Sequence, residues 1–304
     1  MYESYLGLSE RPFSLVPDPH YFFASQPHKE AMNHLFYGIS AGEGFIVVTG
    51  EVGTGKTTLC RTFLKHLQPN IETAVILNPC QSAEELLGAV LEDLGVPIPL
   101  PPSRKALLDA LNCYLLESRA KGKRVVLIID EAQNLPPRVL EQIRLISNLE
   151  TEKEKLIQII LVGQVELSER LARHDLRQLN QRLSVRYRLC PLKRKETRTY
   201  ILFRLHRAGC QRDDFFTRAA FRRIHRLSRG YPRLINLVCD RALMALYAKK
   251  TRRVSSSLAY EAWKSLYPEW DPATKRRWGI SWAPRLGYTL GVLAMALVLG
   301  IVLG

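Results

Sequence analysis

The sequence lacks paired cysteines. Its six cysteines stand singly, with no C-x-x-C pair and no histidine spacing that is typical of zinc ligands. This usage argues against a disulfide framework or a zinc site, and it indicates reduced, mostly buried thiols in the cytosol. The chain also has no internal repeat and no long low-complexity tract, which argues against a repeat architecture.

The first residues lack a continuous apolar run. Segment 1–11 carries the acidic residues Glu3 and Glu10, so it does not resemble a signal peptide. We therefore expect the bulk of the chain to stay in the cytoplasm. With 304 residues, of which 46% are hydrophobic, the chain can hold one large or two modest domains with a sizeable core.

Acidic residues are scarce in the second half. From Arg170 to Arg277 the sequence has 28 Lys plus Arg against 8 Asp plus Glu, and the whole chain has a net charge of +15. A basic half of this kind could lie against anionic lipid or bind nucleic acid or an acidic partner, and a solvated helical surface is the plainest alternative. In this half, no aromatic residues alternate with the basic ones in a way that would let them stack on the bases of single-stranded nucleic acid.

The most informative motif is the glycine-rich run 50–58, GEVGTGKTT, which fits the phosphate-loop pattern G-x-x-x-x-G-K-[ST] between an apolar run and a helix-like run. Backbone N–H groups of such a loop surround the β-phosphate of a nucleotide. Lys56 is expected to reach the β- and γ-phosphates and Thr57 to ligate Mg²⁺. The predicted nucleotide contacts are Gly50, Gly53, Thr54, Gly55, Lys56, Thr57 and Thr58.

A second motif predicts hydrolysis as well as binding. Residues 124–132, RVVLIIDEA, place five apolar residues before two carboxylates, which indicates a strand buried on both faces. This pattern is a Walker B strand. Asp130 is expected to hold the Mg²⁺ coordination shell, and Glu131 is expected to orient and deprotonate the attacking water.

The order of elements predicts an α/β fold. Strands are expected near 45–49, 73–78, 124–129, 156–162 and 184–189, with helices near 56–67, 83–94, 104–121, 137–149 and 166–172. Such alternation predicts a five-stranded parallel sheet covered on both faces, with the ligand at the carboxyl ends of the strands. After Pro191 only helices are expected, near 194–208, 214–227, 232–249 and 256–266, as a C-terminal helical lid.

The last residues predict a membrane anchor. Residues 286–304 are nineteen consecutive uncharged, mainly apolar residues, which as a helix would span roughly 28 Å. Lys275, Arg276, Arg277 and Arg285 precede this run, so the positive-inside rule places the large domain in the cytosol. The alternative is a buried terminal helix. We therefore divide the chain into an N-terminal arm and helix (1–40), a P-loop core (41–191), the lid (192–267), a basic linker (268–285) and a single transmembrane helix (286–304).

Three further residues complete the expected site. Gln164 follows the fourth strand, where its amide could position the lytic water, and Arg233 in the run GYPR could couple closure of the lid to the phosphates. Arg182, just before the fifth strand, is a candidate arginine finger, with Arg177 and Arg186 as rivals.

The motifs, in this order along the chain, resemble the AAA+ superfamily over about residues 28–266. At a finer level MYESYLGLSERPFSLVPDP, GEVGTGKTTLCR, IDEAQNL, VGQVEL, QRLSVRYRLCPL and GYPRLINLVCDRALM resemble the general secretion pathway A (ExeA-type) ATPases and the related ATPases of MSHA-type pilus biogenesis. This resemblance implies an ATP- and Mg²⁺-dependent ATPase at the bacterial inner membrane, single-pass with a cytoplasmic ATPase domain, that helps to assemble a secretion or pilus machine.

The residues and the resemblance together also predict partners. ATP would bind between subunits of a homo-oligomer, with Arg182 of one subunit completing the site of its neighbour. Further expected partners are secretion or pilus-assembly proteins of the inner membrane and an anionic membrane surface. In the secretion members a peptidoglycan-binding region follows the membrane helix, whereas this sequence ends within that helix, which favours the shorter pilus-type or exopolysaccharide-associated relatives.

Three alternatives stay open at this point. A DNA-handling ATPase, similar to a transposition regulator, would use the basic lid to bind nucleic acid. A non-hydrolysing scaffold gated by nucleotide would retain the fold without turnover. A helicase is suggested by the D-E-A-Q run 130–133, but the chain has no room for a second motor domain.

Overall fold

We describe the fold from a computed structural model, in which residues 2–77, 80–152 and 154–266 are described. The predicted linker 268–285 and transmembrane helix 286–304 lie outside these residues. Within the described ranges, no helix is both long and apolar enough to cross a membrane.

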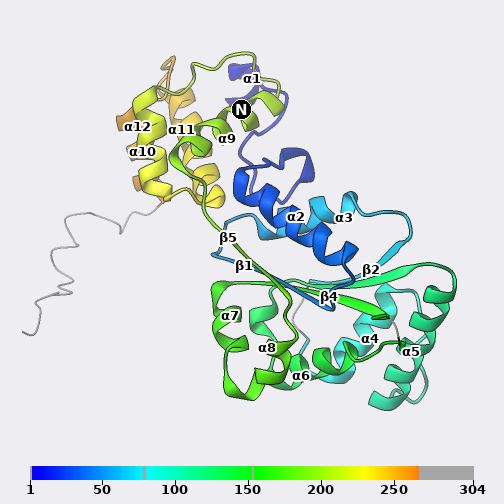
Figure 1. The fold of residues 1–304 in the computed structure, drawn as a ribbon. Helices are drawn as coiled ribbons and strands as arrows, with labels where there is room; N and C mark the ends of the chain where they lie inside the picture. Colours follow the sequence, from blue (N-terminus) through cyan, green and yellow to red (C-terminus); the bar gives the residue numbers. More distant parts are fainter. Residues whose placement is uncertain (1, 78–79, 153, 267–304) are drawn as a thin grey trace, which may run out of the picture. The chain divides into compact units, whose positions relative to one another are not determined.

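A five-stranded parallel sheet forms the centre of the fold (Figure 1). Its strands are β1 (Phe45–Gly50), β2 (Ile71–Ile76), β3 (Arg124–Ile129), β4 (Ile157–Gly163) and β5 (Val185–Leu189), in the order β2-β3-β4-β1-β5. The expected α/β class and the five parallel strands are confirmed. β1 lies between β4 and β5, with Thr49 opposite Gly163 and Gly50 opposite Leu189, so the phosphate loop follows an interior strand of the sheet.

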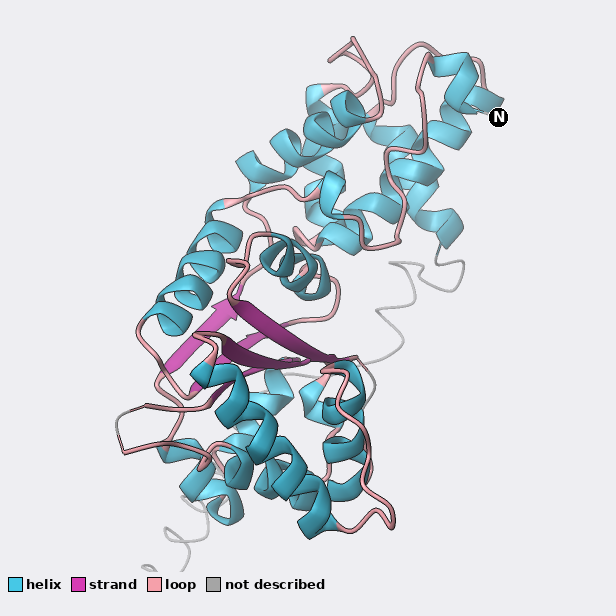
Figure 2. Ribbon diagram, turned by 90° about the vertical axis from the view of Figure 1, so that its right-hand side faces the viewer, coloured by secondary structure: helices cyan, strands magenta, loops and turns pink. Residues whose placement is uncertain are grey.

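The interior strands β1, β3 and β4 are mainly apolar and buried because helices cover both faces of the sheet (Figure 2). Alternate residues of β3 point to opposite faces, so Val126 and Ile128 join one buried cluster while Leu127 joins the other. α2 (Gln26–Ser40) and α3 (Lys56–Lys65) cover the first face. The second face is covered by α4 (Ala83–Asp93), α5 (Arg104–Ala120), α6 (Pro137–Ile146), α7 (Val165–Leu171) and α8 (Arg177–Gln181).

Up to residue 266 four helices follow the sheet, near the ranges that the sequence predicts: α9 (Arg194–Arg207), α10 (Arg218–Ser228), α11 (Pro232–Ala248) and α12 (Ser256–Leu266). α10 is strongly amphipathic, because Phe221 and Ile224 are buried while arginines occupy its outer positions. At the junction of core and lid, the first lid residue, Leu192, donates its N–H to Gly230 O at 2.9 Å. Gly230 has φ +83°, and a Cβ there would lie 2.1 Å from Leu192 O, so only glycine fits this junction.

The N-terminal arm packs on the lid helices. It contains α1 (Tyr2–Leu6) and a 3₁₀ turn, η1 (Pro19–Tyr21). Tyr2 Oη donates to Asp240 at 2.6 Å, and Ser9 N donates to Ala208 O at 2.9 Å. The buried guanidinium of Arg204 donates from Nε to Pro12 O at 2.5 Å. In space the arm therefore belongs with the lid, whereas α2, which follows the arm, packs on the sheet (Figure 1).

Candidate active site

The phosphate loop connects β1 to α3, as its motif requires. Gly53 and Gly55 have φ of +81° and +99°, in the left-handed region that favours glycine. A Cβ on Gly53 would lie 2.8 Å from the Cβ of Arg233, and one on Gly55 would lie 3.0 Å from Nε2 of His28. Both glycines are therefore required by backbone conformation and by close neighbours.

Lys56 begins α3 and is buried within its own loop. Its Nζ donates to Gly50 O at 2.9 Å and to Glu51 O at 3.2 Å. Burial lowers the pKa of Lys56, and the carboxylates of Glu131 and Asp130 act in the opposite direction. The ammonium group thus lies in the concave side of the loop, where two carbonyl oxygens hold it and a phosphate oxygen would be a stronger partner.

The two predicted metal ligands meet. Thr57 Oγ1 donates to Asp130 Oδ2 at 2.9 Å, although the residues are 73 positions apart. Asp130 lies at the carboxyl end of β3 and is 5% exposed. A hydroxyl and a carboxylate oxygen are hard ligands of the kind that Mg²⁺ accepts beside nucleotide phosphates, so this pair fits a magnesium ion.

Glu131 has a strained backbone and an ordered side chain. Its φ is +52°, and its N–H donates to Asp130 Oδ1 at 2.8 Å. Gln133 Nε2 donates to Glu131 Oε2 at 2.6 Å, and Gln164 Nε2 approaches the same oxygen at 3.5 Å. The carboxylate of Glu131 is thereby held at the carboxyl ends of β3 and β4.

Gln133 was not among the predicted site residues. Besides its bond to Glu131, its Oε1 accepts from the backbone N–H of Gln164 at 2.9 Å. It therefore links the ends of β3 and β4 through one side-chain amide. In the sequence, Gln133 stands two residues after Glu131 in the runs IDEAQNL and D-E-A-Q, neither of which predicts a role for it in the site.

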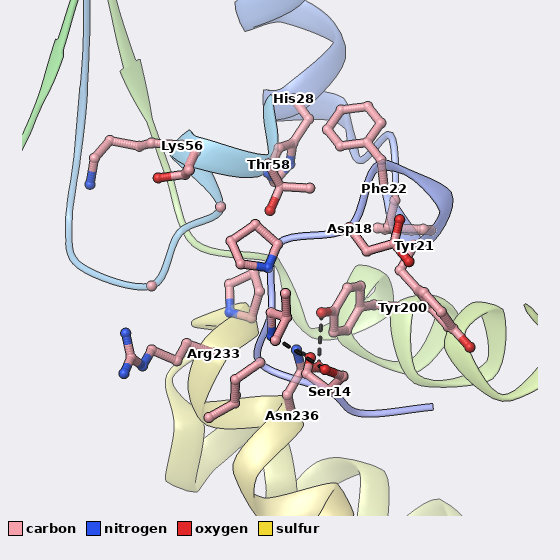
Figure 3. A pocket seen from close by; sticks show the side chains of 18 of the residues that line it. Ser14, Asp18, Tyr21, Phe22, His28, Lys56, Thr58, Tyr200, Arg233 and Asn236 are labelled. Atoms are coloured by element: carbon pink, nitrogen blue, oxygen red, sulfur yellow. Dashed lines mark hydrogen bonds between the residues drawn. The ribbon is translucent and has the colours of Figure 1, made fainter. Parts of the chain in front are cut away.

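Arg233 lies at the phosphate loop. Its backbone N–H donates to Gly53 O at 3.2 Å, and it belongs to the lining of the cavity beside the loop. In Figure 3, Lys56 and Arg233 extend to the same side, away from Tyr200 and Asn236. The structure thus brings a lid arginine next to the loop, as the GYPR run predicts.

Arg182 lies elsewhere. It is exposed at the end of α8 and donates to Ser147 Oγ at 3.2 Å and to Asn148 Oδ1, both just beyond α6. Arg182 does not line the cavity at the loop, and neither do its rivals Arg177 and Arg186. Its role as an arginine finger stays a prediction.

A cavity of about 200 Å³ adjoins the loop between core and lid. Gly53, Gly55, Lys56, Thr57, Thr58 and Glu131 line one part of it. The N-terminal arm, 14–18 and 21–23, lines the other part together with Tyr200 and Asn236 from the lid (Figure 3). The sequence motifs predicted no role in the site for the arm or for these lid residues, although residues 14–18 and Asn236 lie within runs that carry the family resemblance.

His28 is a further residue that the sequence motifs did not indicate. It is 5% exposed at the start of α2, and its Nε2 lies 3.2 Å from Thr54 O in the phosphate loop. Its Nδ1 lies 2.7 Å from Ser25 Oγ. Burial lowers the pKa of His28 to about 4, so the ring is neutral at pH 7 and Nε2–H donates to the loop carbonyl when the hydroxyl of Ser25 donates to Nδ1.

The sheet order, the loop and the Asp-Glu pair define an AAA-type P-loop protein, and comparison with known proteins agrees. Residues 39–171 match the family model of the AAA domain. The chain is 47% identical over 254 residues, 84% of its length, to the General secretion pathway protein A of Aeromonas hydrophila. The chain thus contains a match to the AAA domain and is similar to general secretion pathway protein A, which confirms the predicted resemblance.

Similarity to other proteins is weaker. The ATP-dependent target DNA activator B of Escherichia phage Mu is 30% identical over 148 residues, 49% of this chain. The Aeropyrum pernix ORC2 protein matches the fold with a TM-score of 0.64 at 16% identity, covering 88% of this chain and 74% of that one. This chain spans 46% of the Aeromonas protein and 43% of the phage protein, less than half of each.

Proposed function

We propose that the chain binds ATP with Mg²⁺ and hydrolyses it. The observation that carries this proposal is the hydrogen bond of 2.9 Å between Thr57 Oγ1 and Asp130 Oδ2, beside a buried Lys56. These two oxygens would hold the metal, which when bound would neutralise charge on the phosphates. Lys56 would bind the β- and γ-phosphates together with the N–H groups of its loop.

Glu131 is the proposed base. Its carboxylate lies next to the metal-binding pair and would accept a proton from the attacking water at Oε1 or Oε2. Gln133 and Gln164 contribute by orienting that carboxylate and by offering amide groups to the same water. The strained φ of +52° at Glu131 supports a functional constraint at this position.

The base of the nucleotide would occupy the part of the cavity between the N-terminal arm and the lid. Aromatic side chains border it, including Phe22 and Tyr200, and the carboxamide of Asn236 lies in it (Figure 3). Such a mixture of apolar walls with few polar groups is typical of small-molecule sites. Binding there would join arm, lid and loop, so nucleotide state would be coupled to lid position.

At the level of the cell, we propose an ATPase anchored in the bacterial inner membrane by residues 286–304 that assists assembly of a secretion or pilus machine. The similarity to general secretion pathway protein A supports the secretion role. The apolar run and the basic residues before it support the anchor. We further propose a homo-oligomer in which Arg182, exposed and outside its own cavity, completes the site of a neighbour.

The test is Glu131→Gln in the full chain. This variant should bind ATP with unchanged affinity and lose turnover by about 10²- to 10³-fold, since a general base contributes on this order. Glu166→Gln is the matched control, because Glu166 is an exposed acid at the start of α7. It should keep full turnover. Wild-type turnover in Glu131→Gln would remove Glu131 from the chemistry.

A DNA-handling function is the second candidate. It is favoured by the basic lid and by the similarity to the phage target DNA activators. In that case duplex DNA should raise ATP turnover of the full chain and the effect should decrease with salt, because phosphate contacts release counterions. An ATP turnover rate that is the same with and without duplex DNA at low salt would exclude this function.

A further inference from the structure

Two neighbouring lid helices present arginines to solvent along one surface. We call this set the lid arginine face: Arg194 and Arg198 on α9, Arg218, Arg222 and Arg226 on α10, and Arg229 directly after α10. All six are exposed. The sequence alone indicates only that the region is basic, and the packing of α9 against α10 decides which arginines come together.

The contacts between α9 and α10 fix this arrangement. Thr197 Oγ1 lies 2.9 Å from His225 Nδ1, and the guanidinium of Arg198 lies 5.8 Å from the centre of the Phe221 ring. Burial, and then the nearby charge of Arg194, lowers the pKa of His225. Residues later in α9 contact residues earlier in α10, so the two helices are antiparallel. Their arginines therefore line the same seam between the helices.

These charges have no balancing acids. In the described ranges no ion pair of 4.0 Å or less involves any arginine of the lid arginine face. The nearby Glu196 already accepts from the backbone N–H groups of Gln26 and Lys193. Like charges four residues apart on a helix, as at 222 and 226, destabilise it slightly. The face therefore gains free energy only when negative charge is brought to it.

We propose that the lid arginine face binds the headgroups of an anionic phospholipid bilayer. This step rests on the membrane anchor of the proposed function. α12 lies beside α10, since Arg223 Nε donates to Ser256 Oγ at 3.2 Å and its guanidinium lies 5.5 Å from the centre of the Tyr260 ring. After α12 the sequence reaches the apolar run through residues 267–285, which include Lys275, Arg276 and Arg277.

Because few residues separate the lid from the proposed anchor, a weak attraction between the lid arginine face and the lipid is sufficient for binding. Residues 267–285 are nineteen residues, which reach at most about 65 Å when fully extended, so an anchored lid would stay near the bilayer surface at high effective concentration. Each arginine within reach of an anionic surface strengthens partitioning about fivefold. Single-stranded nucleic acid is a poorer fit, because none of the exposed large hydrophobic or aromatic side chains of the described residues lies on α9 or α10.

The experiment uses the full chain in nanodiscs of phosphatidylcholine, with or without phosphatidylglycerol, and measures the rate at which phenylglyoxal modifies each arginine by mass spectrometry. Arg218 and Arg229 should react at least about fivefold more slowly with anionic lipid, and high salt should restore their rates. Arg104, an exposed arginine at the start of α5 in the core, should react equally in both lipids.

A variant tests the mechanism. Arg194→Gln, Arg198→Gln, Arg222→Gln and Arg226→Gln together should abolish the lipid-dependent protection of Arg218 and Arg229. The control variant removes the same charge from exposed positions on the core: Lys65→Gln, Arg104→Gln, Lys105→Gln and Lys121→Gln. It should keep that protection. Circular dichroism shows that both variants are folded before they are compared.

Each outcome decides. Equal modification rates of Arg218 and Arg229 in both lipids, with the chain embedded in both, would overturn the lipid site and leave the anchor intact. A chain that associates only with anionic nanodiscs, through these arginines, would support the lipid site and refute the anchor. Protection by a DNA duplex and not by anionic lipid would assign the face to nucleic acid and overturn the proposal.

Discussion

Acidification should destabilise the fold through His28. The pKa of this buried ring falls from 6.5 to about 4 in the folded protein. Between these values the unfolded chain binds more protons than the folded chain, so the stability that His28 contributes is complete above pH 6.5 and is lost as pH falls toward 4. For this shift we calculate a loss of about 2 kcal/mol between pH 7 and pH 5.

The position of the His28 ring is the structural cause of its lowered pKa and of the expected loss of stability. If His28 were protonated, its charge would lie on a residue that is only 5% exposed, between Ser25 Oγ and Thr54 O at the base of the phosphate loop. Urea unfolding of the detergent-solubilised full chain, followed by far-ultraviolet circular dichroism at pH 7 and pH 5, measures the change. Because other groups also titrate, the informative quantity is the difference between wild type and His28→Gln, whose amide can still donate to Thr54 O.

His28→Gln should lose about 2 kcal/mol less than wild type between the two pH values. His34→Gln is the control, since His34 is exposed on the same helix, and it should keep the wild-type pH dependence. If His28→Gln and wild type lose the same stability, the buried neutral ring is not the acid-sensitive group and our account of the loop support is wrong.

Three other substitutions test separate parts of the fold and site. Arg182→Ala should lower turnover by about 10³-fold or more and spare ATP binding, whereas unchanged turnover would transfer the finger role to another arginine. Gly230→Ala should lower the free energy of unfolding by more than about 2 kcal/mol, because its Cβ would meet Leu192 O. The control Gly95→Ala, with φ +71° and open space around it, should lower it by only about 1 kcal/mol. Equal losses in urea unfolding would contradict the clash. Arg204→Met should remove the hydrogen bonds to Pro12 O and Ser14 O and lower the free energy of unfolding by about 3 kcal/mol. It should also expose the N-terminal arm to protease. An arm that stays resistant to protease would show that Arg204 does not hold it.

The sequence was informative wherever local pattern and spacing carry the structure. Apolar runs such as 125–129 become buried strands because helices cover both faces of a parallel sheet, and glycines at 53 and 55 are needed where φ is positive. The motif order also predicted that Thr57 and Asp130 would meet, since the carboxyl ends of all strands of a parallel sheet lie at one edge, here with β4 between β1 and β3.

Other features required the tertiary structure. His28 contacts the phosphate loop across 26 residues, and Arg204 holds the N-terminal arm across 192 residues. Neither contact has a periodic or local signature, because each depends on how complete elements pack. By itself the sequence determined the sheet, the loop chemistry and an unbalanced positive charge. Only packing decided that the arm closes the cavity and that six arginines share one seam, since burial and proximity are properties of the folded chain.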